Sequence, residues 1–249
     1  MKTEKDNPPV VVKGLHKSFG EQAVLSGIDL TVGRGETVAV LGRSGTGKSV
    51  LLKLIVGLDQ PDSGSISIQG QEIEDLDEGQ LNEVRKKIGF LFQQAALYDS
   101  LTVEENVAFP LNRHSKMSDA ERKSRVGELL SSVGMEHDLQ KMPSEISGGM
   151  KKRVGLARAL ALEPDILLFD EPTAGLDPIT AEEIGKLISQ LKDERKITSI
   201  VVTHDIHGAK AFSDRLVVMN EGKIVIEGTF GELKKSRDPF LVQFLRNGS

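Results

Sequence analysis

The sequence contains no cysteine and no overall excess of basic residues. Without cysteine the chain forms no disulfide and performs no thiolate chemistry, and this composition fits a reducing compartment. Its 32 Lys and Arg face 37 Asp and Glu, a net charge of −5, so we expect no nucleic-acid partner. No apolar run approaches the ~18 residues of a membrane span, and residues 1–6 show no signal peptide. We therefore expect a soluble, cytoplasmic polypeptide that reaches any membrane through a partner.

A glycine-rich segment follows a short β-branched run. Residues 42–49 are G-R-S-G-T-G-K-S and match the pattern G-x-x-x-x-G-K-[ST]. Glycine can adopt backbone angles closed to other residues, so successive N–H groups would turn toward an anion at the start of a helix near Gly47. Lys48 would then reach the β- and γ-phosphates of a nucleotide, and Ser49 would bind Mg²⁺. The segment predicts a phosphate-binding loop, or otherwise an ordinary turn, made of Gly42, Arg43, Ser44, Gly45, Thr46, Gly47, Lys48 and Ser49.

The rest of the pattern predicts one large α/β domain. Apolar runs at 88–92, 165–169 and 199–202 are typical of buried strands, and predicted helices alternate with them. This alternation implies a mostly parallel sheet with its ligand site at the carboxyl ends of the strands. Alternating residues at 10–13 and 27–32 predict an antiparallel ribbon beside it. From residue 94 to about 143, capping boxes at Thr102 and Ser118 indicate an inserted helical lobe.

Polar residues stand where three of these strands end. Asp170 and Glu171 follow one apolar run. Asp170 would hold Mg²⁺, and Glu171 would be the general base for the water that attacks the γ-phosphate; alternatively, both residues cap the next turn. His204 is either a γ-phosphate contact or a satisfied core histidine. Gln93 would contact the water or the metal where the chain enters the lobe. If the sheet is parallel, these groups meet beside the phosphate-binding loop.

Other features stand away from these strand ends. Ser147 is a good N-cap, and the apolar positions after it recur at helical spacing, so a second helix N-terminus is able to bind phosphate. The basic run at 151–153 predicts a solvated helix face or a contact with phosphate or an acidic partner. Asp177 is the expected N-cap of a helix that starts at Pro178. Phe19 is either a core residue or a platform that stacks on an adenine base.

In their order along the chain, these motifs resemble those of the ATP-binding cassette family over nearly the whole length. S-G-G-x-x-x-R matches the family signature, and the other matches are its D-loop, Q-loop, switch histidine and adenine-stacking aromatic, at Leu176-Asp177, Gln93, His204 and Phe19. The resemblance implies a P-loop NTPase (RecA-like) core, an antiparallel β subdomain and an inserted helical subdomain. We expect a single cassette, with the core and β subdomain at 10–93 and 155–232, the helical signature subdomain at 94–154, and a helical tail at 233–249.

The resemblance also implies cofactors and a second copy of the chain. Cassettes of this family hydrolyse ATP with Mg²⁺, and the signature of one subunit closes on the ATP held by the P-loop of another. Ser147, Gly148 and Gly149 would then serve the site of the second copy, head to tail. Met150 stands where the commonest signature has Gln. Because Met cannot donate an amide hydrogen bond, a contact that this Gln makes elsewhere is in question.

A narrower resemblance concerns the transported substrate. S-G-G-M-x-K-R, the run F-Q-Q-A-A-L-Y-D-S-L-T-V, E-P-T-A-G-L-D-P-I and the tail D-P-F-x-x-Q-F-L together resemble ATPases of MCE-type phospholipid transporters. This implies an ATPase that energises lipid traffic between bacterial inner and outer membranes. An integral permease would hold it at the cytoplasmic face of the inner membrane, with an MCE-domain protein and a small regulatory subunit as further partners.

Three alternatives remain. An ATPase of an importer for a small solute shares much of the same pattern and differs only in its membrane partner. A soluble cassette protein of DNA repair or the ribosome usually carries long coiled-coil or zinc insertions, or two fused cassettes, and the sequence shows neither. A P-loop kinase would need a phosphate-acceptor pocket, and the signature argues against it.

Overall fold

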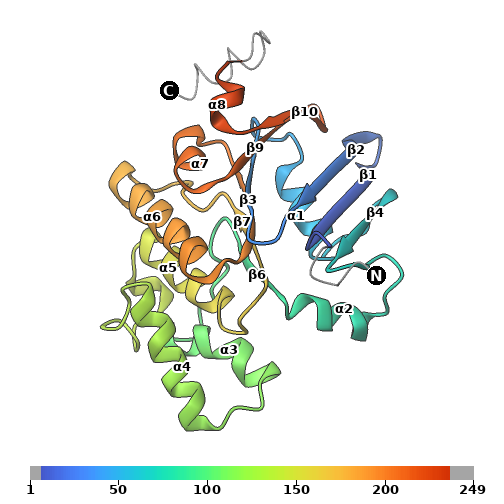
Figure 1. Ribbon diagram of the computed structural model, residues 1–249. Helices are drawn as coiled ribbons and strands as arrows, with labels where there is room; N and C mark the ends of the chain where they lie inside the picture. The colour runs from blue at the N-terminus through green and yellow to red at the C-terminus, as the bar shows by residue number, and fades with distance from the viewer. Residues whose placement is uncertain (1–6, 236–249) are drawn as a thin grey trace.

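The computed structural model describes residues 7–235, in which two β-sheets are covered by helices (Figure 1). The elements, in chain order, are β1 (Val10–Phe19), β2 (Gln22–Val32), β3 (Thr37–Leu41), α1 (Lys48–Ile55), β4 (Ser63–Ile68), β5 (Gln71–Glu72), α2 (Glu78–Arg85), β6 (Ile88–Leu91), α3 (Val103–His114), α4 (Asp119–Ser132), α5 (Gly148–Ala159), β7 (Ile166–Asp170), α6 (Pro178–Arg195), β8 (Thr198–Thr203), α7 (Ile206–Phe212), β9 (Arg215–Asn220), β10 (Lys223–Gly228) and α8 (Phe230–Leu233).

The larger sheet carries the predicted site. Its strand order is β10-β9-β3-β8-β7-β6; the strands from β9 to β6 run parallel, and the edge strand β10 pairs antiparallel with β9. Every residue of β3, β7 and β8 is buried. Parallel strands covered on both faces need continuous apolar runs, which is why these segments were recognisable in the sequence. The prediction of a mostly parallel sheet is confirmed.

Alternate residues of these strands belong to two cores. Val38 and Val40 of β3 pack with α1 and with the smaller sheet. Ala39 and Leu41 face the opposite side, where they pack with α5, α6 and α7. Figure 1 shows this arrangement, with α1, β1, β2 and β4 to one side of the sheet and α5, α6 and α7 to the other. Since successive side chains of a strand point to opposite faces, one strand thus stabilises both layers.

The smaller sheet has the order β2-β1-β4-β5 and is antiparallel, as expected of the ribbon. Its first two strands extend beyond the predicted ranges 10–13 and 27–32. The pairing of β1 with β2 shifts register between Val12 and Leu15, beside Gly14 at φ 51° and Gly27 at φ 83°. Such bulges interrupt the alternation of apolar and polar residues along a strand. The alternating pattern in the sequence is therefore shorter than the strands themselves.

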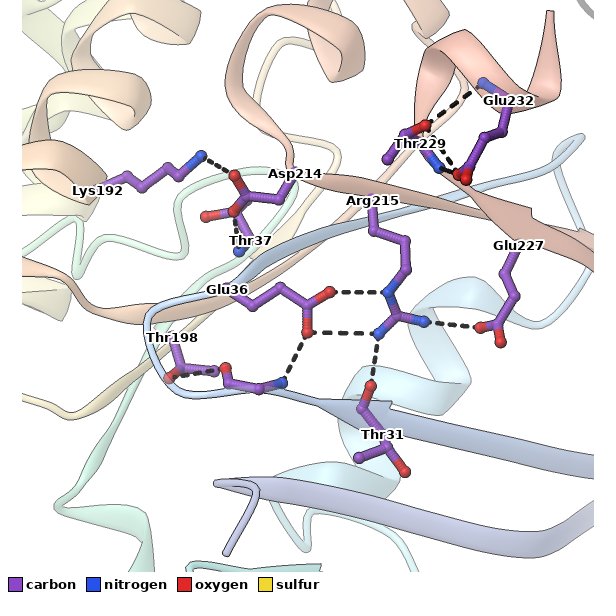
Figure 2. Close-up of polar contacts among 11 residues, drawn as sticks. Thr31, Glu36, Thr37, Lys192, Thr198, Asp214, Arg215, Glu227, Thr229 and Glu232 are labelled. Atoms are coloured by element: carbon purple, nitrogen blue, oxygen red, sulfur yellow. Dashed lines mark hydrogen bonds and ion pairs between the residues drawn. The ribbon is translucent and has the colours of Figure 1, made fainter. Parts of the chain in front are cut away.

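A cluster of charged and polar contacts around Arg215 connects the two sheets (Figure 2). Arg215, at the start of β9, donates through Nε to Glu36 Oε1 at 2.7 Å and through Nη1 to Glu227 Oε2 at 2.7 Å. Its Nη2 donates to the carbonyl oxygen of Thr31, in β2, at 2.5 Å. The hydrogen bond with Glu36 raises the pKa of Arg215 further above its usual range. The cluster therefore fixes the start of β3, whose other end leads into the glycine-rich loop.

The inserted lobe is built as its capping boxes predict. Thr102 caps α3 and Ser118 caps α4, each with a reciprocal hydrogen bond from the N-cap backbone to a Glu. Both helices pack with α5, and Figure 1 shows them below the sheet. The expected boundary at 154/155 falls inside α5, which is continuous, so we propose that the lobe includes the whole helix. Residues 236–249 of the expected tail, with the motif D-P-F-x-x-Q-F-L, lie outside the described residues.

Candidate functional site

The glycine-rich loop runs from β3 into α1, as expected. Gly47 is the N-cap of α1 at φ 95°, and Gly45 has φ 81°, both in the region that favours glycine. At Gly42 a Cβ would lie 2.7 Å from the carbonyl oxygen of Met219 and 2.7 Å from Thr46 Oγ1. At Gly45 nothing lies within 4 Å of such an atom. The loop is thus closely packed at Gly42 and open at Gly45, and its open side fits an anionic phosphate chain.

Lys48, the first residue of α1, is buried over this loop. Its Nζ donates to the carbonyl oxygens of Gly42 at 2.8 Å and Arg43 at 3.1 Å. It also lies 3.5 Å from Glu171 Oε1. A buried ammonium needs such partners because its desolvation is costly. Arg43 and Ser44 are exposed at the outer turn of the loop. The loop therefore carries a fixed positive charge at the place predicted for the β- and γ-phosphates.

The proposed metal ligands Ser49 and Asp170 are brought together from α1 and β7. Ser49 Oγ donates to Asp170 Oδ1 at 2.8 Å. Burial raises the pKa of Asp170, and the hydrogen bond from Ser49 opposes that rise. A hydroxyl and a carboxylate are hard oxygen ligands and fit Mg²⁺, which takes its remaining ligands from water and phosphate. Within residues 7–235, no three His, Cys, Asp or Glu side chains are grouped to hold a metal by themselves.

Glu171 lies between Lys48 and His204, at the carboxyl ends of β7 and β8. Its Oε2 hydrogen-bonds His204 Nδ1 at 2.9 Å, and it is buried, whereas the His204 side chain is 61% exposed. The exposure rules out a core histidine. Glu171 also has φ 47°, a backbone conformation uncommon for a residue with a side chain. Such strain collects at functional sites, where the surroundings hold it in place. A carboxylate placed here is suited to accept a proton from water.

Phe19 lies at the end of β1 and is 52% exposed, so the core interpretation is wrong. Lys17 Nζ lies 5.2 Å from the centroid of its ring, and Asp59 holds that ammonium at 2.9 Å. An exposed aromatic ring is available for stacking on a planar base. Its role as an adenine platform stays a prediction.

The signature segment and Asp177 lie side by side, apart from the glycine-rich loop. Ser147 caps α5 by accepting from the Met150 N–H at 3.2 Å. Gly149 packs so closely on Thr180, in the first turn of α6, that a Cβ would overlap its methyl group. Asp177 caps that same turn. Among the backbone hydrogen bonds of residues 7–235, none joins this group to residues 42–49.

Met150 is partly buried and packs against the apolar core that the lobe shares with one face of the larger sheet. This contact accounts for an apolar residue at the position where the commonest signature has Gln. The chain therefore presents two helix N-termini suited to phosphate, and they belong to different parts of the surface.

One residue near the site was missed in the sequence. Lys152 of α5 is only 4% exposed, so a solvated helix face is wrong for it. Its Nζ donates to the carbonyl oxygens of Gln93 and, at 3.0 Å, Glu171. Burial lowers the pKa of Lys152 to about 8, against the attraction of the carboxylates at 170 and 171. The sequence signal for the burial of Lys152 is its spacing from Gly149, which is also buried, because helical residues three apart share a face. The side chain of Gln93 itself is exposed.

Comparison with known proteins agrees with this geometry. Residues 25–174 match the family described as ABC transporter. The chain is 43% identical over 221 residues to the methionine import ATP-binding protein MetN of Brucella abortus, covering 89% of this chain and 60% of that protein. It is 42% identical over 236 residues to the probable ribonucleotide transport ATP-binding protein mkl of Mycobacterium tuberculosis, covering 95% of this chain and 66% of that protein.

Solved structures agree as well. A dimeric ATP-binding cassette in a post-hydrolysis state, bound to ADP and Pi, has a TM-score of 0.82 and 38% identity, covering 88% of this chain and 98% of that one. The cassette cbiO1 from Clostridium perfringens, described as part of the ABC transporter complex cbiONQ, has a TM-score of 0.84 and 34% identity, covering 97% and 96%. This chain spans about 60% of the length of its methionine-import relatives. The fold, the family match and the site agree, and the chain belongs to the ABC transporter family, with the fold of its ATP-binding cassette.

Proposed function

We propose that this chain couples ATP hydrolysis to transport through an integral membrane permease. The observation that carries the proposal is the position of the Glu171 carboxylate between Lys48 and His204, beside the Ser49–Asp170 pair. When bound, Mg²⁺ supplies positive charge against the phosphate oxygens. Lys48 binds the β- and γ-phosphates, and Glu171 accepts the proton of the attacking water. His204, hydrogen-bonded to Glu171, orients that carboxylate and contacts the γ-phosphate.

We further propose that two copies of the chain share their sites. No backbone hydrogen bond joins the Ser147 N-terminus of α5 to the loop at 42–49 within the described part of the chain. Both ends are donor groups for phosphate, so a head-to-tail pair lets the signature of each copy face the loop of the other. The description of a similar solved cassette as dimeric supports pairing of two copies. In the proposed pair, Ser147, Gly148, Gly149 and Asp177 would lie at the contact between copies.

The permease is proposed to dock between the sheet and the helical lobe. A cavity of about 390 Å³ lies there, next to Gln93, and two aromatic pairs line it. Phe90 and Phe92 stack at 4.1 Å between ring centroids, and Tyr98 lies 4.6 Å from Phe109. Aromatic-lined hollows suit an inserted apolar side chain or helix end. No helix in residues 7–235 is long and apolar enough to cross a bilayer.

Docking is tested by charge insertion at two exposed apolar residues. Tyr98, 46% exposed, lines the cavity, whereas Val225, 49% exposed, lies on β10. We expect Tyr98→Glu to lose co-purification with the permease, because moving a carboxylate from water into an apolar contact is costly, and Val225→Glu to retain it. The reverse pattern, or cross-links that fall only on the hairpin at 216–226, would contradict this surface.

The transported substrate is proposed from residue-level resemblance. The segment S-G-G-M-x-K-R and the run at 92–103 favour phospholipid transport with an MCE-domain protein and a small regulatory subunit, at the cytoplasmic face of the inner membrane. The names of the relatives favour a second candidate, an importer of a small solute, since one is described as a methionine import protein. Reconstitution with the permease separates them. Stimulation of ATPase turnover by phospholipid alone supports the first, and stimulation by a solute with its binding protein supports the second.

The hydrolytic assignment is tested with Glu171→Gln. The amide cannot accept the proton of water, so we expect multiple turnover to fall by at least about 100-fold while ATP binding persists. The matched control is Glu194→Gln, an exposed residue near the end of α6, which should hydrolyse ATP at the wild-type rate. A Glu171→Gln variant that no longer retains ATP would mean that the carboxylate is structural.

A further inference from the structure

α5 holds the backbone of two other segments through the buried side chain of Lys152. Lys152 lies five positions after Ser147, about 7.5 Å along the helix, so it is about one and a half turns from the start of the signature helix. Its two acceptors, the carbonyls of Gln93 and Glu171, are 59 and 19 residues away in the chain. They belong to the segments that follow β6 and β7. One ammonium thus joins three segments, and its several donors suit it to more than one acceptor.

The same helix holds the segment after Gln93 at a second point. Arg158 Nη2 donates to the Ala95 carbonyl at 2.6 Å, and Nη1 donates to the Ala96 carbonyl at 2.8 Å. Ala95 and Ala96 have φ 58° and 47°, a left-handed conformation that is unfavourable for residues with a Cβ. Such a backbone persists only where its surroundings hold it. Residues 93–96 are therefore fixed to α5 at both ends.

We propose that Lys152 is a positioning residue that makes the signature helix, Gln93 and Glu171 move as one unit. The proposal rests on the proposed function, because Glu171 and the signature act there in opposite sites of a pair. A displacement of α5, when its N-terminus meets the phosphates held by the second copy, is passed through Lys152 to the backbone that carries Glu171.

The test compares Lys152→Met with Lys151→Met on the neighbouring position of the same helix. Met keeps the length of the side chain and removes the donors. The first measurement is hydrogen–deuterium exchange of the nucleotide-free protein. We expect Lys152→Met to exchange at least about 10-fold faster over residues 92–97 and 171–174, and Lys151→Met to match the wild type. Lys152→Arg, which keeps a charged donor, should restore most of the protection.

The second measurement is ATPase kinetics in the assembled complex. We expect kcat of Lys152→Met to fall about 10-fold or more while KM for ATP changes less than about twofold, because an interaction that positions the base acts mainly in the transition state. Lys152→Arg should recover to within about threefold of the wild type.

Unchanged exchange at 92–97 and 171–174 in Lys152→Met, or an equal effect in Lys151→Met, would overturn the proposal. If Lys152→Met fails to fold, Lys152→Leu removes the same donors with another apolar side chain, and protection equal to wild type there would also overturn the proposal. The exchange measurement needs no hydrolysis. A wild-type complex without ATPase activity would therefore refute the proposed function. The exchange measurement would still test the role of Lys152.

Discussion

Two glycines of the phosphate-binding loop separate backbone strain from steric overlap. Gly45 and Gly47 have similar φ angles, 81° and 95°, so an alanine at either pays the left-handed cost of about 1–2 kcal/mol. The two positions differ in the room that surrounds an added Cβ. A Cβ at Gly45 meets nothing within 4 Å, whereas at Gly47 it lies 2.7 Å from Leu25 Cδ2 and 2.8 Å from the carbonyl oxygen of Val24.

The carbonyl at Val24 cannot yield easily, because it belongs to β2 of the smaller sheet. Overpacking of this kind costs about 1–3 kcal/mol more. We therefore expect Gly45→Ala to lower the free energy of unfolding by about 1–2 kcal/mol and Gly47→Ala to lower it by at least about 1 kcal/mol more than that. Urea unfolding of the nucleotide-free protein measures both. Equal losses in the two variants, or a larger loss in Gly45→Ala, would refute the geometry of the loop described above.

Three further predictions concern charge and caps. Lys48→Ala should hydrolyse ATP in the assembled complex at under about a tenth of the wild-type rate, because the γ-phosphate loses its main counter-charge; a higher turnover would remove Lys48 from the site. The hydrogen bond from Lys17 lowers the pKa of Asp59 below 3.8, so its stabilisation is complete above that pH and is lost as pH falls through the lowered pKa. The unfolding free energies of wild type and Asp59→Asn should converge as the solution is acidified through this range, and a constant difference would contradict the pair. Thr102→Ala should destabilise the protein by about 1 kcal/mol in the same unfolding assay, and no loss would contradict its role as N-cap of α3.

The sequence predicts local features well because they depend on neighbouring residues alone. The capping boxes at Thr102 and Ser118 are confirmed, as is the N-cap at Asp177. Fully buried parallel strands are equally predictable, because burial of both faces requires a continuous run of apolar residues. These strands bring Lys48 and Ser49 beside the acidic pair at the end of β7, as the topology rule implies.

Features that depend on contacts between distant segments could not be predicted. The sequence left His204 and Phe19 each with two interpretations, and only their exposure decides against the core. Lys152 lies in a basic run that resembles a solvated face, and its burial follows from the packing of α5 under the loop at 93–96. The extent of β1 was hidden by a bulge beside Gly14. The roles of the site residues remain predictions.

The most direct test of the account mixes two inactive variants. Its central claim is that the Ser147 end of one copy completes the Lys48 site of another. In a heterodimer of Ser147→Arg and Lys48→Ala subunits, one site lacks both defects and the other carries both. Random pairing makes half of the dimers heterodimers, so we predict recovery to about a quarter of wild-type turnover if one intact site suffices, with each homodimer below about a tenth. Recovery in the mixture supports the claim, and wild-type turnover in Ser147→Arg homodimers would contradict it.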